Sequence, residues 1–434
     1  MTAARDDAHA IWLAAVRAAD PERLVREALA RHPLPPARRL IVVGAGKAGA
    51  GMAAGLEAAL TDCPVTGIVN VPAGLSRQLS QIRLHAARPV GVNEPTAAGV
   101  AGADEMLRLL SGAGPDDVAV CLLSGGGSAL LPAPADGITL DDKLAVTRLL
   151  HRSGATIDEM NCVRKHLSRV KGGRLAAAFH GRLLLTLIVS DVVGDPLDVI
   201  ASGPTAPDPT TFTDAVAVLA RYGLTDRVPP AVNTLLARGV AGDVPETLKA
   251  LAPNVVNRVI GSNRLALHAA TAEAERRGYR VLDLGAFVEG ETAAVATAVA
   301  GVVRSVRRDG KPFPPPACVL VGGETTVTLG DRPGKGGRNQ EFVLALLHKL
   351  AATPEGLTGV TVLSGGTDGE DGPTDAAGAV VDADTLERAV AHGLSMADHL
   401  QRHDAYPFFA ATGDLLTPGL TGTNVMDVRV VLVR

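Results

Sequence analysis

Short apolar runs recur along the chain, separated by segments in which apolar residues follow helical spacing. Uninterrupted apolar runs of about four to eight residues are typical of strands buried on both faces. The sequence predicts strands within residues 39–46, 67–71, 81–87, 118–127, 182–191, 257–262, 317–324, 359–369 and 406–414. It predicts helices over residues 8–31, with an interruption near Pro21, and over 47–60, 94–111, 264–277, 337–351 and 384–391. This alternation predicts an α/β fold with a parallel sheet covered on both faces.

Glycine, aspartate and serine cluster where seven of these predicted strands end. In open parallel sheets, ligands bind beyond the carboxyl ends of the strands, so we expect a ligand site there. The periodic pattern is weakest over residues 222–257, which contain four prolines. We therefore expect an N-terminal domain over residues 1–240 and a C-terminal domain over residues 241–434.

Composition narrows the class of protein. The chain has 42 Lys and Arg against 46 Asp and Glu, a net charge of −4, and only 3 % aromatic residues, which disfavours a nucleic-acid partner. Its 4 cysteines are far apart and predict neither disulfides nor structural zinc. His399 and His403 lack the glutamate of a zinc-protease motif and are interpreted as surface histidines. No apolar run approaches the ~18–20 residues that span a bilayer, so we expect a soluble, cytoplasmic protein without a membrane partner.

The first glycine cluster, GAGKAG, lies between a predicted strand and a predicted helix. Gly44, Gly46 and Gly49 satisfy the G-x-G-x-x-G pattern, which is typical of a pyrophosphate resting on a helix N-terminus. However, Asn70 stands where a dinucleotide-binding chain has an acidic residue, and Lys47 lies inside the loop. A tight turn with a solvated lysine is an equally good interpretation of this motif alone.

The second cluster follows the strand predicted within residues 118–127. It consists of Ser124, Gly125, Gly126, Gly127 and Ser128. Consecutive glycines allow backbone N–H groups to converge on an anion. A strained turn is the alternative, but three adjacent glycines at a strand end favour a binding function.

Basic and acidic residues follow in the middle of the chain. Arg164 and Lys171 belong to a basic segment that by itself indicates a solvated helix face, although Lys171 precedes two glycines that are costly inside a helix. Asp191 ends a predicted strand and is a hard oxygen ligand suited to Mg²⁺. Asp195 precedes a proline and is interpreted as a helix cap.

The C-terminal half carries a second set of polar residues. Arg338 and Asn339 start a predicted helix after a glycine-rich segment, where an arginine suits bidentate recognition of carboxylate or phosphate. Glu324, Asp368 and Asp375 lie near predicted strand ends. Anion nests, basic residues and carboxylates together match phosphoryl transfer, which depends on positioning, metal and positive charge.

Several long motifs resemble those of the MOFRL-type (class II) glycerate kinases. They are GAGKAG, LLSGGGSALL, NCVRKHLSRVKGGRLA, VSDVVGDPLDVIASGPTAPDPTTF, GGETTVTLG, GKGGRNQEF, LSGGTDGEDGPTDAAGA and TGTNVMDV. The similarity extends from about residue 8 to residue 434. One segment departs from it, because Arg88–Glu94 replaces a His-Pro-x-Pro-Asp-Glu motif of many members.

The resemblance implies a Rossmann-like N-terminal domain and a smaller C-terminal α/β domain, with the active site in the cleft between them. It implies an ATP- and Mg²⁺-dependent kinase acting on D-glycerate, most readily at the 2-hydroxyl. The matching lysine and arginine, Lys47 and Arg338, are the leading catalytic or substrate-binding candidates. A homodimer is one state of assembly that the sequence leaves open.

These expectations combine into one mechanism. The two glycine loops, Lys171 and Asn339 bind phosphate or nucleotide, and Lys47 neutralises the transferring phosphoryl group. Arg338 holds the glycerate carboxylate or the γ-phosphate. Asp191 coordinates Mg²⁺, and Glu324, Asp368 and Asp375 lie in the substrate or metal neighbourhood.

Two other functions compete with this hypothesis. An NAD(P)H-dependent hydroxypyruvate reductase is suggested by the G-x-G-x-x-G pattern and opposed by Asn70 and Lys47. A non-catalytic phosphometabolite-binding protein is disfavoured because no output domain is recognised in the sequence.

Overall fold

The computed structural model describes residues 3–60, 63–75, 77–89, 92, 94–330 and 333–434. Residues 90, 91 and 93 of the segment that departs from the family motif lie outside this description. The chain forms two compact units: Pro21–Ile260, and Met1–Asp20 together with Gly261–Arg434. We call them the glycine-loop unit and, after the family that its sequence motifs resemble, the MOFRL unit.

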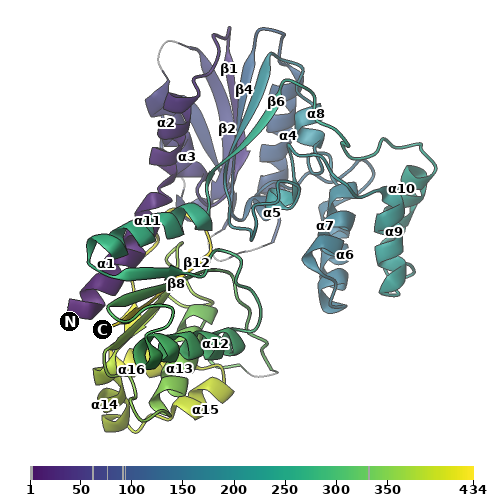
Figure 1. The fold of residues 1–434 in the computed structure, drawn as a ribbon. Helices are drawn as coiled ribbons and strands as arrows, with labels where there is room; N and C mark the ends of the chain where they lie inside the picture. The colour runs from purple at the N-terminus through teal and green to yellow at the C-terminus, as the bar shows by residue number, and fades with distance from the viewer. Residues whose placement is uncertain (1–2, 61–62, 76, 90–91, 93, 331–332) are drawn as a thin grey trace. The chain divides into compact units, whose positions relative to one another are not determined.

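A six-stranded sheet forms the centre of the glycine-loop unit (Figure 1). Its strands are β1 (Leu40–Ala45), β2 (Val65–Pro72), β3 (Ile82–Arg88), β4 (Val118–Ser124), β5 (Leu183–Val189) and β6 (Val255–Gly261). The order is β3-β2-β1-β4-β5-β6, and the pairs from β3 to β5 are parallel. This order is that of a Rossmann-like doubly wound sheet, which confirms the expected class.

The order of the strands reverses between β1 and β4, which are paired directly. In doubly wound sheets such a switch point opens a crevice for ligands at the carboxyl ends of the strands. The segments that leave β1 and β4 there are the two glycine loops. The fold thus brings together two motifs that are 80 residues apart, counted from Gly46 to Gly126.

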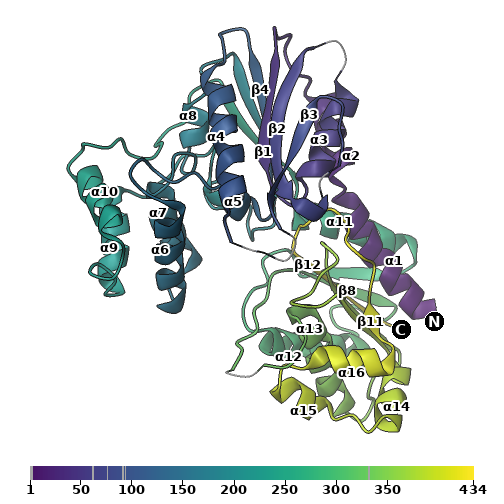
Figure 2. The same cartoon turned by 180° about the vertical axis from the view of Figure 1, so that it is seen from behind.

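The helices of this unit form two groups. They are α2 (Pro21–Arg31), α3 (Gly49–Ala59), α4 (Ala97–Ser111), α5 (Gly127–Leu130), α6 (Leu140–Arg152), α7 (Ile157–His166), α8 (Arg174–Ala177), α9 (Phe212–Arg221) and α10 (Pro230–Val240), with 3-10 turns at Ala73–Leu75 and Ile200–Ser202. Helices α6, α7, α9 and α10 stand to one side of the sheet (Figures 1 and 2) and have their own apolar core around Phe212 and Val163. We call them the helical group.

The MOFRL unit contains a second six-stranded sheet, which is mixed rather than parallel. Its strands are β7 (Arg280–Asp283), β8 (Ala317–Gly323), β9 (Val360–Gly366), β10 (Gly378–Val381), β11 (Leu415–Leu416) and β12 (Asp427–Val433). The order is β11-β10-β9-β12-β8-β7, and β12 runs antiparallel to both β8 and β9. The sheet is mixed because the C-terminal strand enters its centre from the opposite direction, and the smaller C-terminal unit has the expected α/β class.

Helices flank this second sheet. They are α1 (Ala3–Ala18), α11 (Asn263–Arg276), α12 (Thr292–Arg304), α13 (Arg338–Ala351), α14 (Ala383–Ala391), α15 (Met396–Gln401) and α16 (Ala405–Thr412), with a π-helical turn at Ser305–Asp309. The strand predicted within residues 406–414 is helix α16, because Phe408 and Phe409 pack into the core on a helical turn. Among the residues described, no helix is long and apolar enough to cross a membrane.

The compact units differ in two places from the expected ranges 1–240 and 241–434. Residues 241–260 belong to the glycine-loop unit, because β6 extends its sheet. Helix α1 belongs to the MOFRL unit, where Arg5 forms buried ion pairs with Asp382 and Asp414 and Trp12 donates a hydrogen bond to the Gly365 carbonyl. The order of the elements along the sequence does not show that the N-terminal helix packs with the C-terminal half of the chain.

Candidate active site

The first glycine loop is shaped by close packing against neighbouring strands. A Cβ atom at Gly44 would lie 2.3 Å from the carbonyl oxygen of Leu122, and one at Gly46 would lie 2.0 Å from Ser124 Oγ. A Cβ atom at Gly49 would lie 2.9 Å from a methyl group of Val69. At all three glycines the backbone lies so close to β2 or β4 that a side chain would not fit. This packing alone requires glycine there, whatever the loop binds.

The backbone donors of this loop already have protein acceptors. The N–H groups of Gly46, Lys47 and Gly49 donate to backbone carbonyls at 2.8–3.1 Å, and that of Ala48 donates to Ser124 Oγ at 3.0 Å. The loop therefore presents the partly exposed side chain of Lys47, rather than a nest of N–H groups.

The second glycine loop differs in this respect. Gly126 adopts a left-handed conformation with φ of 74°, which glycine tolerates without strain. Among the residues described, the N–H groups of Gly126, Gly127 and Ser128 donate to no protein acceptor. A Cβ atom at Gly126 would lie 3.5 Å from Lys47 Cγ and 3.6 Å from Arg88 Nη2. The first glycine loop and the end of β3 thus place two cations, Lys47 and Arg88, beside open backbone donors.

Two further cations contact Ser128. Lys171 Nζ donates to Ser128 Oγ at 2.8 Å and to the Ser128 carbonyl at 3.0 Å, and Arg164 Nη2 also donates to Ser128 Oγ. Helix α7 ends at His166, and Gly172 and Gly173 adopt left-handed turns before α8. Lys171 therefore lies in a turn, and the glycines that are costly in a helix serve to form it. The basic segment is a partly buried cluster rather than a solvated helix face.

Asp191 lies two residues beyond β5, the strand that pairs with β4, and is partly buried. Because Ser124 pairs with Val189, Asp191 and the second glycine loop leave adjacent strand ends. Asp195 has a φ of 56°, and the residues that follow it directly form turns and a 3-10 turn rather than an α-helix. Its interpretation as a helix cap was wrong, because the Pro196 segment forms turns that lead to a 3-10 turn.

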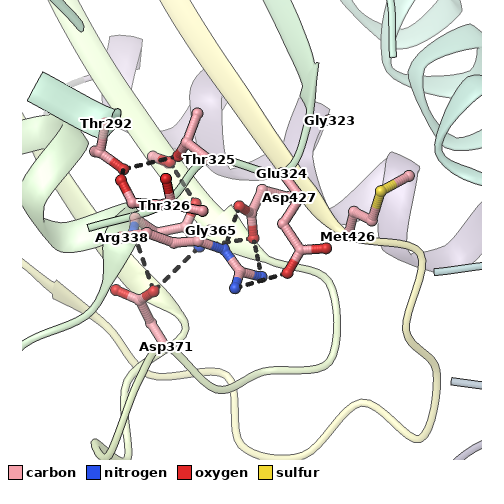
Figure 3. A network of polar contacts seen from close by, with 12 residues as sticks. Thr292, Gly323, Glu324, Thr325, Thr326, Arg338, Gly365, Asp371, Met426 and Asp427 are labelled. Carbon is pink, nitrogen blue, oxygen red and sulfur yellow. Dashed lines mark hydrogen bonds and ion pairs between the residues drawn. The ribbon is translucent and has the colours of Figure 1, made fainter. Parts of the chain in front are cut away.

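Arg338 is the centre of a polar network in the MOFRL unit (Figure 3). Its Nε and Nη2 donate to the two carboxylate oxygens of Asp427 at 2.6 and 3.1 Å, and its Nη1 lies 2.9 Å from Glu324 Oε1. Burial lowers the pKa of Arg338, but the carboxylates of Asp427 and Glu324 outweigh it and raise the pKa overall. Arg338 is thus held in place by one buried and one half-exposed carboxylate.

The same network closes the N-terminus of α13. Asp371 accepts hydrogen bonds from the backbone N–H groups of Asn339 and Gln340 at 3.0 and 2.9 Å. Asn339 Nδ2 donates to Asp427 at 2.8 Å, and Ser364 Oγ donates to Asn339 Oδ1 at 2.6 Å. Burial raises the pKa of Asp371 to about 7, although the two N–H donors oppose this shift. This helix end therefore already has an acidic partner.

Beneath Arg338, Arg429 is completely buried. Its Nη2 donates to Asp427 Oδ2 at 3.2 Å and to Thr325 Oγ1 at 2.8 Å. Its Nε and Nη1 have no hydrogen-bond partner among the residues described. Burial lowers the pKa of Arg429. Asp427 consequently pairs with two arginines at once, and within the described part of the chain it is the only ion-pair partner of Arg429.

The two remaining acidic candidates lie in different surroundings. Asp368 follows β9, and its Oδ1 and Asn339 Nδ2 would both lie within 4 Å of a Cβ atom at Gly366, so Asp368 borders the network. Asp375 is exposed and accepts a hydrogen bond from the Tyr406 hydroxyl at 2.7 Å. Among the described residues, it forms no hydrogen bond or ion pair with Arg338.

Arg338 also lines a cavity of about 280 Å³ within the MOFRL unit. Glu341 and His403 line it as well, and His403 Nδ1 lies 2.9 Å from Glu341 Oε2. His399 is buried and its ring packs edge-on against Phe408. The interpretation as a surface residue was therefore wrong for His399, which α15 directs into the core, whereas His403 is partly exposed and lies against Glu341.

The sequence motifs do not indicate three residues of these clusters. Asp427 and Arg429 lie at the start of a strand rather than at its end, and Arg88 belongs to the segment that departs from the family motif. A usable signal existed for Asp427, since it immediately precedes the apolar run VRVVLV.

Two family models match the chain. Residues 7–237 match a domain of unknown function, DUF4147, and residues 317–427 match the MOFRL family. With the geometry described above, these matches define a class of two-unit α/β enzymes in which a Rossmann-like unit is combined with a MOFRL unit. The chain belongs to the MOFRL-type glycerate kinase family.

Named relatives cover nearly the whole chain. The glycerate 2-kinase of Pyrococcus horikoshii is 39 % identical over 91 % of this chain and 87 % of its own length. A protein of Agrobacterium vitis named "Putative hydroxypyruvate reductase" is 44 % identical over 99 % of this chain and 94 % of its own. The crystal structure of a glycerate kinase from Thermotoga maritima superposes with a TM-score of 0.89 at 34 % identity and covers 99 % of both chains.

Proposed function

We propose that this protein transfers the γ-phosphoryl group of ATP to D-glycerate and forms 2-phosphoglycerate. The observation that carries the proposal is the switch point of the glycine-loop unit. There, Lys47 and Arg88 flank Gly126, and Arg164 and Lys171 converge on Ser128, beside open N–H groups. Four cations on one glycine loop suit a polyphosphate, and the relatives named glycerate kinases support glycerate as the acceptor.

In this mechanism, the second glycine loop and Lys171 hold phosphate oxygens, and Lys47 neutralises charge on the transferring group. An oxygen–phosphorus bond forms to the glycerate hydroxyl while the bond to the bridging β,γ-oxygen breaks. The hydroxyl proton leaves to solvent or to a phosphate oxygen, since a loose transition state needs little base catalysis. Gly44, Gly46 and Gly49 contribute by letting Lys47 approach this loop.

Mg²⁺ is the expected metal, and Asp191 is the residue we assign to it. Mg²⁺ keeps several waters and needs only one or two carboxylates when phosphate oxygens complete its shell. No group of three or more ligating side chains occurs among the residues described, which suits a metal delivered with a nucleotide. When bound, the metal would supply charge neutralisation to the phosphate oxygens.

Arg338 is proposed to hold the glycerate carboxylate or the γ-phosphate. Its partner Asp427 is fully buried, whereas the side chain of Glu324 is 41 % exposed. An incoming anion therefore replaces Glu324 most easily, while Asp427 keeps the guanidinium oriented. Because Arg338 lines the cavity of the MOFRL unit, a small hydroxy acid that enters there meets its guanidinium.

A hydroxypyruvate reductase is the competing function, and one relative bears that name. The structure offers it little support. The N–H groups of Gly46, Lys47 and Gly49 are already used, so they do not bind a pyrophosphate. Asn70, at the position of the ribose-binding acid, is fully buried and donates to the carbonyls of Gly99 and Leu130.

One pair of assays separates the two functions. The purified full chain is given D-glycerate, ATP and Mg²⁺, and ADP release is followed through a coupled reaction. A second sample receives hydroxypyruvate and NADH or NADPH, without ATP. We expect glycerate-dependent ADP release and no oxidation of either reduced nucleotide. Oxidation without any need for ATP would instead establish the reductase, and tight binding of phosphometabolites without turnover in either assay would establish a binding protein.

A further inference from the structure

The cavity of about 280 Å³ in the MOFRL unit combines an apolar wall with three ionisable side chains. Val327 and Pro373 belong to the apolar wall, and the ionisable side chains are those of Arg338, Glu341 and His403. A mainly apolar hollow with a few polar groups is the usual form of a small-molecule site. The arrangement of the polar groups therefore indicates which ligand the cavity accepts.

Arg338 and Glu341 stand three residues apart on α13, so they lie on the same face of this helix. Nevertheless, they form no ion pair with each other in the described structure. Arg338 pairs with Asp427 and Glu324, whereas Glu341 contacts His403. The cation and the carboxylate are thus held by separate partners, and both line the cavity.

Glu341 and His403 form a closely coupled pair. Glu341 is 4 % exposed, and its Oε2 lies 2.9 Å from His403 Nδ1. Burial raises the pKa of Glu341, and the hydrogen bond to His403 opposes this shift. When Glu341 is ionised, it accepts the Nδ1 proton of the neutral ring, so Nε2 is left as the acceptor nitrogen. In the part of the chain that is described, His403 Nε2 has no hydrogen-bond partner.

The backbone of His403 is also unusual. Its φ is 50°, a left-handed conformation that few residues other than glycine adopt. Its N–H donates to the Leu400 carbonyl at 3.1 Å, in the turn directly after α15. Strained conformations of this kind persist where the surrounding structure enforces them, and they cluster at ligand sites. The turn after α15 holds the ring of His403 against Glu341 at the wall of the cavity.

We propose that the cavity binds the hydroxy acid with its carboxylate on Arg338, and that His403 Nε2 accepts a hydrogen bond from the hydroxyl that is not phosphorylated. The inference rests on the proposed function, in which Arg338 meets glycerate. It adds His403 as a residue that favours a dihydroxy acid, and Glu341 as the residue that positions the ring. Transfer to the 2-hydroxyl leaves the 3-hydroxyl, at the end of the molecule away from the carboxylate, as the group that contacts His403.

D-Lactate tests this contact because it is D-glycerate without the 3-hydroxyl. A site that accepts a hydrogen bond from a hydroxyl disfavours an analogue that lacks it, since the protein group then stays unpaired. Binding of each acid to the full chain is measured by calorimetry without ATP. We expect D-glycerate to bind at least about tenfold more tightly than D-lactate, as for the loss of one such hydrogen bond.

His403→Asn separates the ligand contact from the structural role of this residue. Asparagine tolerates the left-handed backbone and has an amide that donates to Glu341, but it has no atom at the position of Nε2. We expect the affinity for D-glycerate to fall to near that for D-lactate, while the affinity for D-lactate stays nearly unchanged. The matched control is His348→Asn, which replaces an exposed histidine of α13 outside the cavity lining and should bind both acids as wild type does.

Glu341→Met tests the positioning role, because it removes the carboxylate that orients the ring and leaves Nε2 in place. We expect the ratio of the two affinities to fall towards one. The double variant with His403→Asn should show no further fall, since both substitutions remove the same hydrogen bond to the ligand. Urea unfolding followed through the buried Trp12 verifies that each variant folds.

The inference is overturned if wild type binds the two acids equally or binds neither. It is also overturned if His403→Asn leaves the ratio unchanged, including the case in which both acids weaken by the same factor. Effects of the two single substitutions that multiply in the double variant would remove Glu341 from the positioning role.

These measurements involve no turnover, so this inference and the proposed function fail separately. A chain that phosphorylates glycerate but shows no His403-dependent preference for it over D-lactate contradicts only this inference. A chain that shows the preference but releases no ADP contradicts only the proposed function.

Discussion

Asp427 and Glu324 both pair with Arg338, but they should contribute very differently to stability. Asp427 is fully buried and accepts hydrogen bonds from Arg338, Asn339 and the buried Arg429. Asp427→Asn keeps the shape of the side chain but removes the ion-pair partner of the buried Arg429. Breaking a buried ion pair from one side costs about 3–5 kcal/mol of unfolding free energy. Glu324→Gln, the matched control, removes a half-exposed partner and should cost no more than about 1 kcal/mol.

The assay is urea unfolding followed by tryptophan fluorescence. Trp12 is the only tryptophan of the chain and is buried in the MOFRL unit, where it donates to the Gly365 carbonyl. Its emission therefore reports the unit that contains both substitutions. We expect the midpoint of Asp427→Asn to fall well below those of Glu324→Gln and wild type, with a similar slope. The reasoning would be refuted if Asp427→Asn cost less than about 1 kcal/mol, or if Glu324→Gln were equally destabilising.

Three other predictions concern the site. Lys47→Ala and Arg338→Ala should each lower kcat/KM for glycerate by about 100-fold or more, as for the loss of a group that stabilises transition-state charge, and near-wild-type values would remove both from the mechanism. Asp191→Asn should raise the Mg²⁺ concentration needed for half-maximal rate while leaving urea unfolding nearly unchanged, and an unaltered Mg²⁺ dependence would argue against this ligand. The pKa of Asp371 is raised to about 7, so between about pH 4 and pH 7 its carboxyl group is protonated in the folded state and ionised in the unfolded state. The unfolding free energy of wild type should therefore fall relative to that of Asp371→Asn as the pH rises through this range. A constant difference between the two proteins would contradict the shift.

The sequence predicted the glycine-loop unit well because its signals are local. Each central strand is an uninterrupted apolar run that ends in glycine, and the two loops that matter follow β1 and β4 directly. Helix α16 was mistaken for a strand because Tyr406, Phe408 and Phe409 have high strand propensity, which tertiary packing on α13 and α15 overrides.

Asp427 shows why part of the site could not be predicted. A parallel sheet binds its ligands at the carboxyl ends of its strands, so the sequence indicates candidate site residues only at those ends. Because β12 runs antiparallel to β8 and β9, its first residue pairs with Gly323 and Gly366 at their last residues. The start of β12 therefore lies beside the ends of β8 and β9, and this placement follows only from the direction of β12 in the sheet.

Lys143 and Arg88 illustrate a second limit. Both are charged residues in ordinary surroundings along the sequence, and their burial depends on contacts made by distant segments. The charge of Arg164 acts on Lys143 only once α6 has packed beside α7. Clusters of this kind are properties of the tertiary structure, and no local pattern encodes them.

The central claim is phosphorylation of the 2-hydroxyl of glycerate, and phosphorus NMR of the reaction mixture tests it most directly. The γ-phosphorus signal of ATP should disappear while a phosphate ester signal grows only in samples that contain D-glycerate. Position 2 bears one hydrogen, so the proton-coupled ester signal should be a doublet, whereas position 3 bears two and would give a triplet. A doublet is the predicted result. A triplet would contradict the assigned position, and the absence of any ester signal would contradict the kinase itself.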